Sequence, residues 1–594
     1  METYQNHGFC EEPDAFVSGD QRKKPVSPFE GPLSRDKADV RTSGSRISRS
    51  LFTLRAVIVL AFALRAGFML VSTDSANHEG IYYLRVAENL LAGKGYVGLR
   101  ENGLQLLYPP LFPGAIALAT ALVGNAESAA RLIDLLAGTA LVIPIYLIAR
   151  RLGGERVALL SAFLAAVHPY LVALSTSIFS ENLYLLFLLA GVYGVIGARS
   201  DARYAWCSAA LAGACFGLAY LARPEGLVFA GVGAIALSLV KSGRPILRLR
   251  LAVILAGCTA VIALPYMAWL TASTGQLLLE SKSADNYAAK KQILAHVPLG
   301  EIFFGINDDL SPKGASMESN AEEIRQWHQD SYHAVRFAIE TAPQSIWDVV
   351  RWLVFKRVLG GPVLVVCAIT GLICGIRRRE PWFIHGALLA LAGGALLALL
   401  FVPTQRVFQD RYLVSFLPPM LIWSAGGIAI MSAWIGEKAV ARGWVAAAGR
   451  TRRRVEVAAS VLPAALLILL PLSTLRGTSE FGQGWGDSHV AKQVGLWLKG
   501  HLSGQHARVM DLTPTVAYYS GSTMACFPWT TPDKALAYIE SKKIDYLVLP
   551  SRADETIPYL ASWIKDGIPD KRATAIHRAQ DRGGGEIVVY RWAH

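Results

Sequence analysis

Acidic residues and a histidine gather in one stretch, residues 73–113, directly after the first long apolar run of the chain. Asp74, His78 and Glu79 lie near its beginning. A carboxylate at the outer surface of a membrane can act as general base on a hydroxyl group, if it comes within hydrogen-bond distance. A structural role suits the same residues, because Asp74 could cap a following helix and the other acids could be solvated loop charges. The residue types alone leave both interpretations open.

Three arginines and one glutamate at the ends of apolar runs, or within them, are further candidates. Arg65 lies inside the first apolar run, where a guanidinium must reach the membrane surface, pair with an acid or hold an anion. Arg223 and Arg411 occupy outer turns, and Arg411 could hold a phosphate with two hydrogen bonds or pair with Asp410 or lipid headgroups. Glu181 begins an apolar run and is either a solvated anchor or points into a cavity of the helical bundle.

The composition indicates a membrane protein. Of the 594 residues, 53% are hydrophobic and 17% charged, whereas soluble proteins carry about 25% charged residues. The net charge of +13 does not point to nucleic acid, because the basic residues lie in short loops between apolar runs. This placement is typical of membrane proteins, in which basic loops stay on the cytoplasmic side. The seven cysteines show neither a disulfide framework nor the spacing of zinc ligands.

The apolar runs predict a mainly α-helical, polytopic membrane protein with about eleven transmembrane helices. The run 51–72 is too long and begins too late for a cleavable signal peptide. In the first outer loop, apolar residues from Ile81 to Leu91 recur at helical spacing and predict an amphipathic helix lying on the bilayer. The expected parts are a disordered, basic cytoplasmic tail (1–50), a membrane domain (51–476) with outer loops at 73–128 and 271–356, and a soluble domain (477–594). The expected spans are 51–72, 129–149, 157–174, 182–197, 206–221, 227–240, 251–270, 358–376, 383–402, 412–435 and 455–472.

The C-terminal segment, residues 477–594, has the charge content of a soluble domain. Strand patterns alternate with helical ones, which indicates a small extracytoplasmic α/β domain with a largely parallel sheet. We find no phosphate-binding loop or nucleophile elbow in it, so a role in substrate recognition or packing is expected. The expected helices are 487–503, 532–541 and 556–565, and the expected strands are 507–512, 544–550 and 586–592.

Six motifs, in order, resemble the C-type membrane glycosyltransferases that use polyprenyl-phosphate sugars, in the branch of protein O-mannosyltransferases and the lipid A aminoarabinose transferase. Each motif is weak alone, but together they cover about residues 51–425. The motifs are HisGluGlyIleTyrTyrLeuArgValAlaGluAsnLeuLeuAlaGlyLysGlyTyr (78–96), TyrProProLeuPhePro (108–113), AlaAlaArgLeuIleAspLeuLeuAlaGly (129–138), SerGluAsnLeuTyr (180–184), LeuAlaArgProGluGly (221–226) and ArgTyrLeuValSerPheLeuProPro (411–419).

The resemblance implies an inverting glycosyltransferase, which moves a hexosyl or pentosyl unit from polyprenyl phosphate to an acceptor hydroxyl at the outer face of the membrane. The family pattern carries an acidic pair in the first outer loop, and here His78 takes the first place of that pair. Glu79 is therefore the favoured base with Asp74 as the substitute, and Glu181 and His78 are expected to support it.

For the donor phosphate, the implied ligands are Arg411, Arg65 and Arg223, and the implied substrate-binding residues are Tyr83 and Tyr412. The leaving phosphate departs as a stable anion, so it requires positive charge more than a strong acid. No cofactor and no metal ligand are expected. A divalent ion is possible at two adjacent loop acids, Asp308 and Asp309, which are more often only solvated.

The expected partners are a polyprenyl-phosphate sugar, an unidentified glycan, lipid or protein acceptor, and the lipid bilayer. The expected location is the inner membrane of a bacterium, with a cytoplasmic N-terminus and a periplasmic C-terminal domain. The alternatives are a secondary transporter or lipid flippase and a membrane scaffold. Transporters tend to show internal repeats and broken helices at the midplane, and no convincing repeat is seen here.

Overall fold

The computed structural model describes residues 43–72, 75–100, 103–200, 202–239, 245–312, 331–356, 359–378, 381–400, 402, 409–446, 450–474, 488–550, 557–580 and 585–594. The chain divides into two compact units, Met1–Thr53 and Leu54–His594. Most of the expected tail, 1–50, lies outside the described residues, but its last part is helical, because the first helix begins at Ser43.

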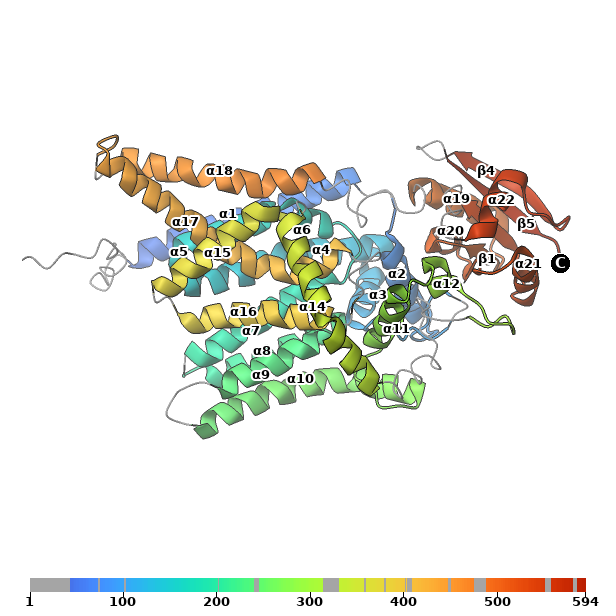
Figure 1. Cartoon of the computed structure of the whole chain (residues 1–594), viewed down its shortest axis with the longest axis horizontal. Helices are drawn as coiled ribbons and strands as arrows, with labels where there is room; N and C mark the ends of the chain where they lie inside the picture. Colours follow the sequence, from blue (N-terminus) through green and yellow to red (C-terminus); the bar gives the residue numbers. More distant parts are fainter. Residues whose placement is uncertain are drawn as a thin grey trace, which may run out of the picture. The chain divides into compact units, whose positions relative to one another are not determined.

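The membrane part consists of helices (Figure 1). The first ten are α1 (Ser43–Ser72), α2 (His78–Leu91), α3 (Leu111–Val123), α4 (Ala126–Ala140), α5 (Val142–Val167), α6 (Pro169–Leu174), α7 (Glu181–Ser200), α8 (Ala205–Ala222), α9 (Gly226–Ser238) and α10 (Pro245–Thr274). They are followed by α11 (Lys282–Leu294), α12 (Leu299–Phe304), α14 (Ser331–Phe355), α15 (Gly361–Arg377), α16 (Trp382–Leu399), the 3-10 helix η3 (Asp410–Phe416), α17 (Leu417–Ala441) and α18 (Arg450–Thr474).

Eight helical segments among the described residues are long and apolar enough to cross a membrane. One of them, Ala126–Val167, is 42 residues long and is broken at Gly153 and Gly154, whose backbone torsions are not helical. The break lies where the sequence predicts the end of one span and the start of the next. Three further apolar helices, α3, α9 and α15, are shorter. The polytopic, mainly helical class is confirmed, and the number of about eleven spans stays a prediction.

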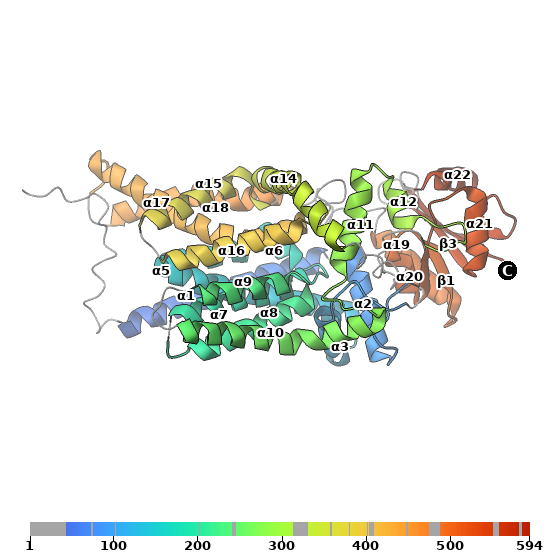
Figure 2. The ribbon, with the colours of Figure 1, turned by 60° about the horizontal axis from the view of Figure 1, so that its bottom comes forward.

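Small residues allow the helices to pack closely. In both views α7, α8, α9 and α10 run side by side (Figure 2), and α15 packs on α17. A side chain at Gly371 would collide with the backbone of Trp423, and one at Gly427 with the backbone of Cys367. Close approach of backbones at small residues is a main source of helix association in membranes, where the surrounding lipid is as apolar as leucine.

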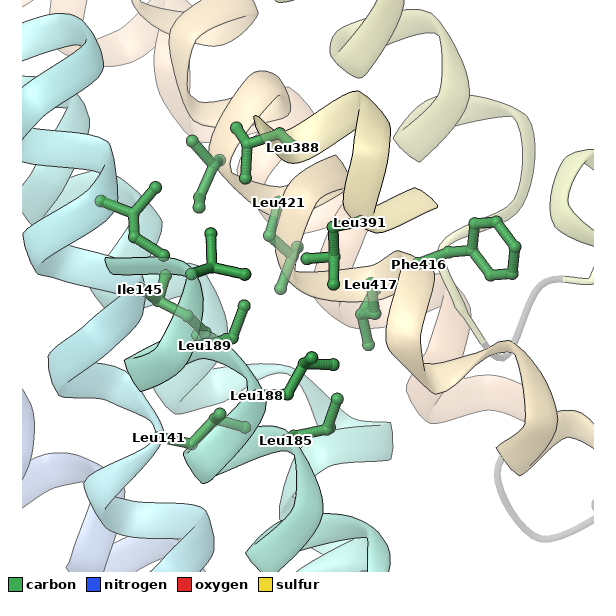
Figure 3. Packing of buried hydrophobic residues seen from close by; sticks show 14 of the residues in the cluster. Leu141, Ile145, Leu185, Leu188, Leu189, Leu388, Leu391, Phe416, Leu417 and Leu421 are labelled. Atoms are coloured by element: carbon green, nitrogen blue, oxygen red, sulfur yellow. The ribbon is translucent and has the colours of Figure 1, made fainter. Parts of the chain in front are cut away.

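An apolar core joins the helices that carry the candidate residues. It includes residues of α5, α7, α16 and α17 and consists largely of leucines and alanines, whereas large apolar residues such as Leu118, Val261 and Val366 are exposed on the outside of the helices. Figure 3 shows Leu141, Ile145, Leu185, Leu188, Leu189, Leu388, Leu391, Phe416, Leu417 and Leu421 in this core.

The first outer loop contains the predicted helix, α2, but the expectation that it lies on the bilayer is wrong. Side chains on all of its faces are buried, including Tyr82, Tyr83, Leu84 and Val86. The helix is enclosed by α3, α4 and α20 of the C-terminal segment. A helix buried on all sides belongs to a protein core, so α2 is held by protein contacts rather than by lipid.

The second outer loop, expected at 271–356, contains the helices α11, α12 and α14, joined by non-helical segments. At the end of this loop, Lys356 Nζ lies 2.7 Å from Asp410 Oδ1 at the start of η3.

The C-terminal segment forms a five-stranded sheet with strand order β2-β1-β3-β5-β4. β1 pairs in parallel with β2 and β3, whereas β5 pairs antiparallel with β3 and β4. The expected small α/β fold is confirmed, but the sheet is mixed rather than largely parallel. Sequence reasoning missed α20, β2 and β4, because two of these elements are short and β4 is mostly exposed and interrupted by a bulge. The elements are α19 (Ser488–Leu502), β1 (Arg508–Asp511), α20 (Pro514–Ser520), β2 (Thr523–Cys526), α21 (Pro532–Ser541), β3 (Tyr546–Pro550), α22 (Pro558–Asp566), β4 (Ala573–Gln580) and β5 (Glu586–Trp592).

Candidate active site

Glu79 lies in the first turn of α2, where the side chain of Asn77 caps the helix by accepting a hydrogen bond from Gly80 N at 2.5 Å. The carboxylate is 8% exposed. Its Oε1 accepts a hydrogen bond from the Tyr83 hydroxyl at 2.8 Å, and its Oε2 pairs with Arg411 Nη2. Burial favours the protonated form, but Arg411 outweighs it and holds the pKa of Glu79 at about 2. Glu79 is therefore a carboxylate at neutral pH.

Arg411 connects Glu79 to a second acid. It lies in η3, is 6% exposed, and donates from Nη1 to Glu181 Oε1 at 3.4 Å and from Nε to Gln409 Oε1 at 2.5 Å. Its guanidinium also lies over the ring of Tyr412, 5.4 Å from the centroid. A planar guanidinium with several donors can exchange one anionic partner for another without losing its place.

Glu181 is the first residue of α7 and is 1% exposed. Its Oε1 lies 2.5 Å from Arg223 Nη1, and Arg223 in turn reaches Glu225 Oε1 at 3.1 Å. Glu181 Oε2 has no hydrogen-bond partner among the residues that the structure describes. A buried oxygen without a partner is costly and calls for an explanation. We call Glu79, Glu181, Arg223, Glu225 and Arg411 the Arg411 cluster.

A small pocket, partly open to solvent, adjoins the Arg411 cluster. One part of its wall is polar and the other is apolar, the latter largely from the end of α16. Such a wall suits an anionic group that carries an aliphatic chain. The lining residues are Tyr184, Arg223, Glu225, Ala395, Ala398, Leu399, Arg411, Tyr412, Val414 and Ser415.

An aromatic wall backs Glu79. The ring of Tyr83 lies 4.8 Å from that of Tyr108 and 5.0 Å from that of Phe112. The Tyr83 hydroxyl also lies 3.2 Å from Ser180 Oγ, beside Glu181. Burial raises the pKa values of Tyr83 and Tyr108 well above the ordinary value, so both phenols stay protonated.

Buried hydrogen bonds hold the turn before Glu181 in place. Asp134 of α4 is fully buried and accepts from Phe179 N and from Asn182 Nδ2, each at 3.1 Å. Asn182 also donates to the Leu174 carbonyl at 2.9 Å. These bonds leave the residues of the turn little freedom, so Ser180 and Glu181 keep their places. Sequence reasoning included Asp134 in a motif but assigned it no role.

Arg65 is not part of the Arg411 cluster, in contrast to its expected role as a phosphate ligand. It is fully buried and donates to Ser175 Oγ at 3.1 Å and to the carbonyls of Ala165 and Ala166 at 3.3 and 3.0 Å. Those carbonyls lie in the last turn of α5, where intrahelical partners are missing. A cation at a helix C-terminus is also favoured by the helix dipole. Arg65 thus caps α5, and its donors are engaged by protein. We call Arg65, Ser175, Asn182 and Asp134 the Asp134 cluster.

The remaining predicted residues have different places. Tyr83 and Tyr412 both contact the Arg411 cluster. His78 stacks edge-on against Tyr82, with centroids 5.6 Å apart, and burial together with Arg100 lowers the pKa of His78 to about 4, so its imidazole is neutral. Asp74 lies outside the described residues.

Lys282, which sequence reasoning missed, lies at the start of α11 and interacts electrostatically with the charged groups of the Arg411 cluster. Burial lowers the pKa of Lys282, as do Arg223 and Arg411, while Glu79 and Glu225 raise it. A possible signal was the charged pattern Glu280, Lys282, Asp285 in an otherwise apolar neighbourhood.

Among the residues that the structure describes, no group of three or more His, Cys, Asp or Glu side chains is placed to hold a metal ion. Glu79 and Glu181 each pair with an arginine.

Comparison with known proteins agrees with this architecture. Residues 108–269 match the family model of dolichyl-phosphate-mannose-protein mannosyltransferase. None of the curated proteins matches the chain in sequence. Among solved structures, the chain is similar to the archaeal oligosaccharyltransferase AglB from Archaeoglobus fulgidus in complex with an inhibitory peptide and a dolichol-phosphate. The two are 13% identical with a TM-score of 0.59, over 92% of this chain and 75% of that one.

A second similar structure is ArnT from Cupriavidus metallidurans bound to undecaprenyl phosphate, with 13% identity and a TM-score of 0.55 over 92% of this chain and 98% of that one. At such identities the likeness shows the fold. Together with the family match, it confirms the resemblance that the motifs indicate: the chain is a multi-pass membrane protein with the fold of the C-type, polyprenyl-phosphate-dependent membrane glycosyltransferases.

Proposed function

We propose that the protein is an inverting glycosyltransferase, which moves a sugar from a polyprenyl phosphate to an acceptor hydroxyl at the outer face of the membrane. The observation that carries the proposal is the Arg411 cluster. It brings a candidate base, Glu79, and two buried arginines together beside a cavity that is polar at one side and apolar at the other.

The donor phosphate would bind at the arginines. Arg411 and Arg223 offer charge-assisted hydrogen bonds to phosphate oxygens, and the apolar wall from α16 would take the first part of the polyprenyl chain. In transfer, the acceptor oxygen forms a bond to the anomeric carbon as the bond from that carbon to the phosphate oxygen breaks. The electron pair leaves with the phosphate, where the arginines stabilise the developing charge.

Glu79 would take the proton of the acceptor hydroxyl. In the structure it pairs with Arg411, which makes it a weak base. A donor phosphate at Arg411 would draw the guanidinium away from Glu79. Burial, the largest influence on this carboxylate, would then raise its pKa. The donor would therefore both supply the sugar and activate the base.

Two further observations support a donor class and a membrane side. The family model names dolichyl-phosphate mannose, so mannosyl donors come first among the candidates, with aminopentosyl donors next. The broken segment at Gly153 and Gly154 carries Arg150, Arg151 and Arg156, as expected for the cytoplasmic side. We place the Arg411 cluster and the C-terminal segment on the opposite side, in the periplasm of a bacterium.

The test uses purified protein in lipid with a panel of radiolabelled polyprenyl-phosphate sugars, and it measures the release of free polyprenyl phosphate. We expect wild type to release it from at least one donor. Glu79→Gln should lower the rate by roughly 10²- to 10⁴-fold, the usual contribution of a general base. Glu88→Gln is the matched control, because Glu88 lies on the same helix and contacts Tyr518 instead of the Arg411 cluster.

Two results would contradict the proposal. A full rate in Glu79→Gln would exclude Glu79 as the base, and Asp74→Asn would then be the next variant. If wild type neither binds nor turns over any donor, the protein is not a transferase of this class, and transport of a lipid becomes the better hypothesis.

A further inference from the structure

The C-terminal segment contacts the chain just before the candidate base. Tyr519 lies in α20, is 9% exposed, and its hydroxyl oxygen accepts a hydrogen bond from Ala76 N at 2.9 Å. The same hydroxyl donates to Glu127 Oε2 at 2.9 Å, at the start of α4. Ala76 is 1% exposed and directly precedes Asn77, the residue that caps α2. One phenol thus joins three parts of the chain that are far apart in sequence.

Arg131 holds the same peptide unit from its other side. It donates from Nη2 to the Ser75 carbonyl at 3.0 Å and from Nη1 to the Thr176 carbonyl at 2.8 Å. The Ser75 carbonyl and the Ala76 N–H belong to one peptide group. The carbonyl of this peptide accepts a hydrogen bond from Arg131, and its N–H donates one to Tyr519. Two separate hydrogen bonds therefore fix the orientation of the peptide plane.

Glu127 connects the two contacts. Besides the Tyr519 hydroxyl, it accepts hydrogen bonds from Arg131 Nη2 at 2.9 Å and from Lys492 Nζ at 3.1 Å. Lys492 belongs to α19, so a second helix of the C-terminal segment takes part. Hydrogen bonds to an ionised carboxylate are roughly twice as strong as neutral ones. Burial and Glu127 raise the pKa of Tyr519, which keeps the phenol able to donate.

We propose that Tyr519 is a positioning residue: it fixes the Ser75–Ala76 peptide and so places Glu79, in the first turn of α2, against Arg411 and the bound donor. The inference rests on the proposed function, because it gives the C-terminal segment a part in that reaction. A shift of about 1 Å in a reacting group costs up to about 100-fold in rate, so a contact that touches no substrate can control turnover.

Tyr518 provides a matched control. It is the preceding residue of α20, equally buried, and its hydroxyl donates to Glu88 Oε1 at 2.8 Å, near the other end of α2. Tyr519→Phe and Tyr518→Phe each remove one hydroxyl from the same short helix. They differ in which end of α2 loses its contact.

The experiment measures kcat, the KM for the donor, and amide hydrogen exchange of the peptide 75–84 in both variants. Tyr519→Phe should lower kcat by about tenfold with the donor KM changed less than about twofold, and should speed exchange in 75–84. Tyr518→Phe should leave kcat and that exchange near wild type. Arg131→Lys, which loosens the same peptide from the side of α4, should reproduce the kcat loss if Tyr519→Phe folds poorly.

The proposal is overturned if both tyrosine variants lose activity equally, if the loss follows thermal stability, or if the donor KM rises while kcat stays constant. Hydrogen exchange needs no substrate. Faster exchange in 75–84 in Tyr519→Phe, with no turnover in wild type, would therefore support the positioning contact while the proposed function fails.

Discussion

Two buried polar clusters lie near each other in this protein, and they are satisfied in different ways. In the Asp134 cluster, most bonds run between a side chain and the backbone: Arg65 to three carbonyls, Asn182 to one, and Asp134 to an amide. In the Arg411 cluster, the bonds run between charged side chains of four separate segments.

The partners of a buried charged side chain therefore indicate whether its role is structural or functional. A side chain that pairs with backbone cannot release it without exposing an unsatisfied group, which costs about 1–3 kcal/mol. A side chain that pairs with other side chains can exchange partners with a ligand without exposing a backbone group. The Arg411 cluster also leaves Glu181 Oε2 without a partner among the described residues and adjoins a cavity. These two features support the proposal that the Arg411 cluster binds a ligand, and the Asp134 cluster shows neither among the described residues.

The largest change in activity is expected for a substitution of Arg411. Arg411→Met should lower kcat/KM for the donor by about 10²- to 10³-fold, because the phosphate loses a charge-assisted ligand. Some loss of thermal stability is also expected, because Glu79 and Glu181 are buried and would lose this cation as a partner. Steady-state kinetics and a thermal melt in lipid nanodiscs would check both. A variant with normal kinetics and a lowered melting point would show that Arg411 is structural.

Arg65→Met should give the reverse pattern. Loss of the cap on α5 leaves the carbonyls of Ala165 and Ala166 unpaired, and we expect a loss of about 2–4 kcal/mol in unfolding free energy. Activity per folded molecule should remain within about twofold. Denaturant unfolding with active-site titration separates the two quantities. A selective rise in the donor KM would instead return Arg65 to the phosphate site.

Gly138→Ala tests whether close packing holds the Asp134 cluster in place. A Cβ at Gly138 would collide with Ser175 Oγ, so we expect a destabilisation of about 1–3 kcal/mol. The control is Gly386→Ala in α16, where a Cβ meets nothing within 4 Å and the higher helix propensity of alanine should be neutral or stabilising. Equal melting points for the two variants would contradict a tightly packed cluster.

The smallest effect is a pH dependence. As a base, Glu79 works only when deprotonated, so activity falls as pH drops through its pKa. With the pKa held at about 2 by Arg411, kcat/KM, which reports the free enzyme, should stay flat down to about pH 5. The acid limb of kcat should lie at higher pH, because the bound phosphate competes for Arg411. Coincident limbs would argue against the exchange of partners at Arg411.

Much of this molecule follows from local sequence. The lengths of apolar runs determine which segments are helical and apolar enough to cross a membrane, and the pattern of the last hundred residues determines most elements of the small α/β segment. The order of the motifs leads to the fold class, and three of the predicted site residues, Glu79, Glu181 and Arg411, contact one another. These features depend on periodicity and residue type within one segment, which the chain displays directly.

Tertiary structure decided the rest. An arginine inside an apolar run has the same local signature whether it caps a helix, as Arg65 does, or awaits a ligand, as we propose for Arg411. The choice depends on which distant groups the packing brings within about 3 Å. Other features also depend on segments that are far apart in the sequence. The neighbours that bury α2 come from separate segments, Lys282 interacts electrostatically with acids of other loops, and Tyr519 bonds to Ala76. A buried polar group must find partners wherever the fold supplies them, and no local pattern in the sequence names those partners.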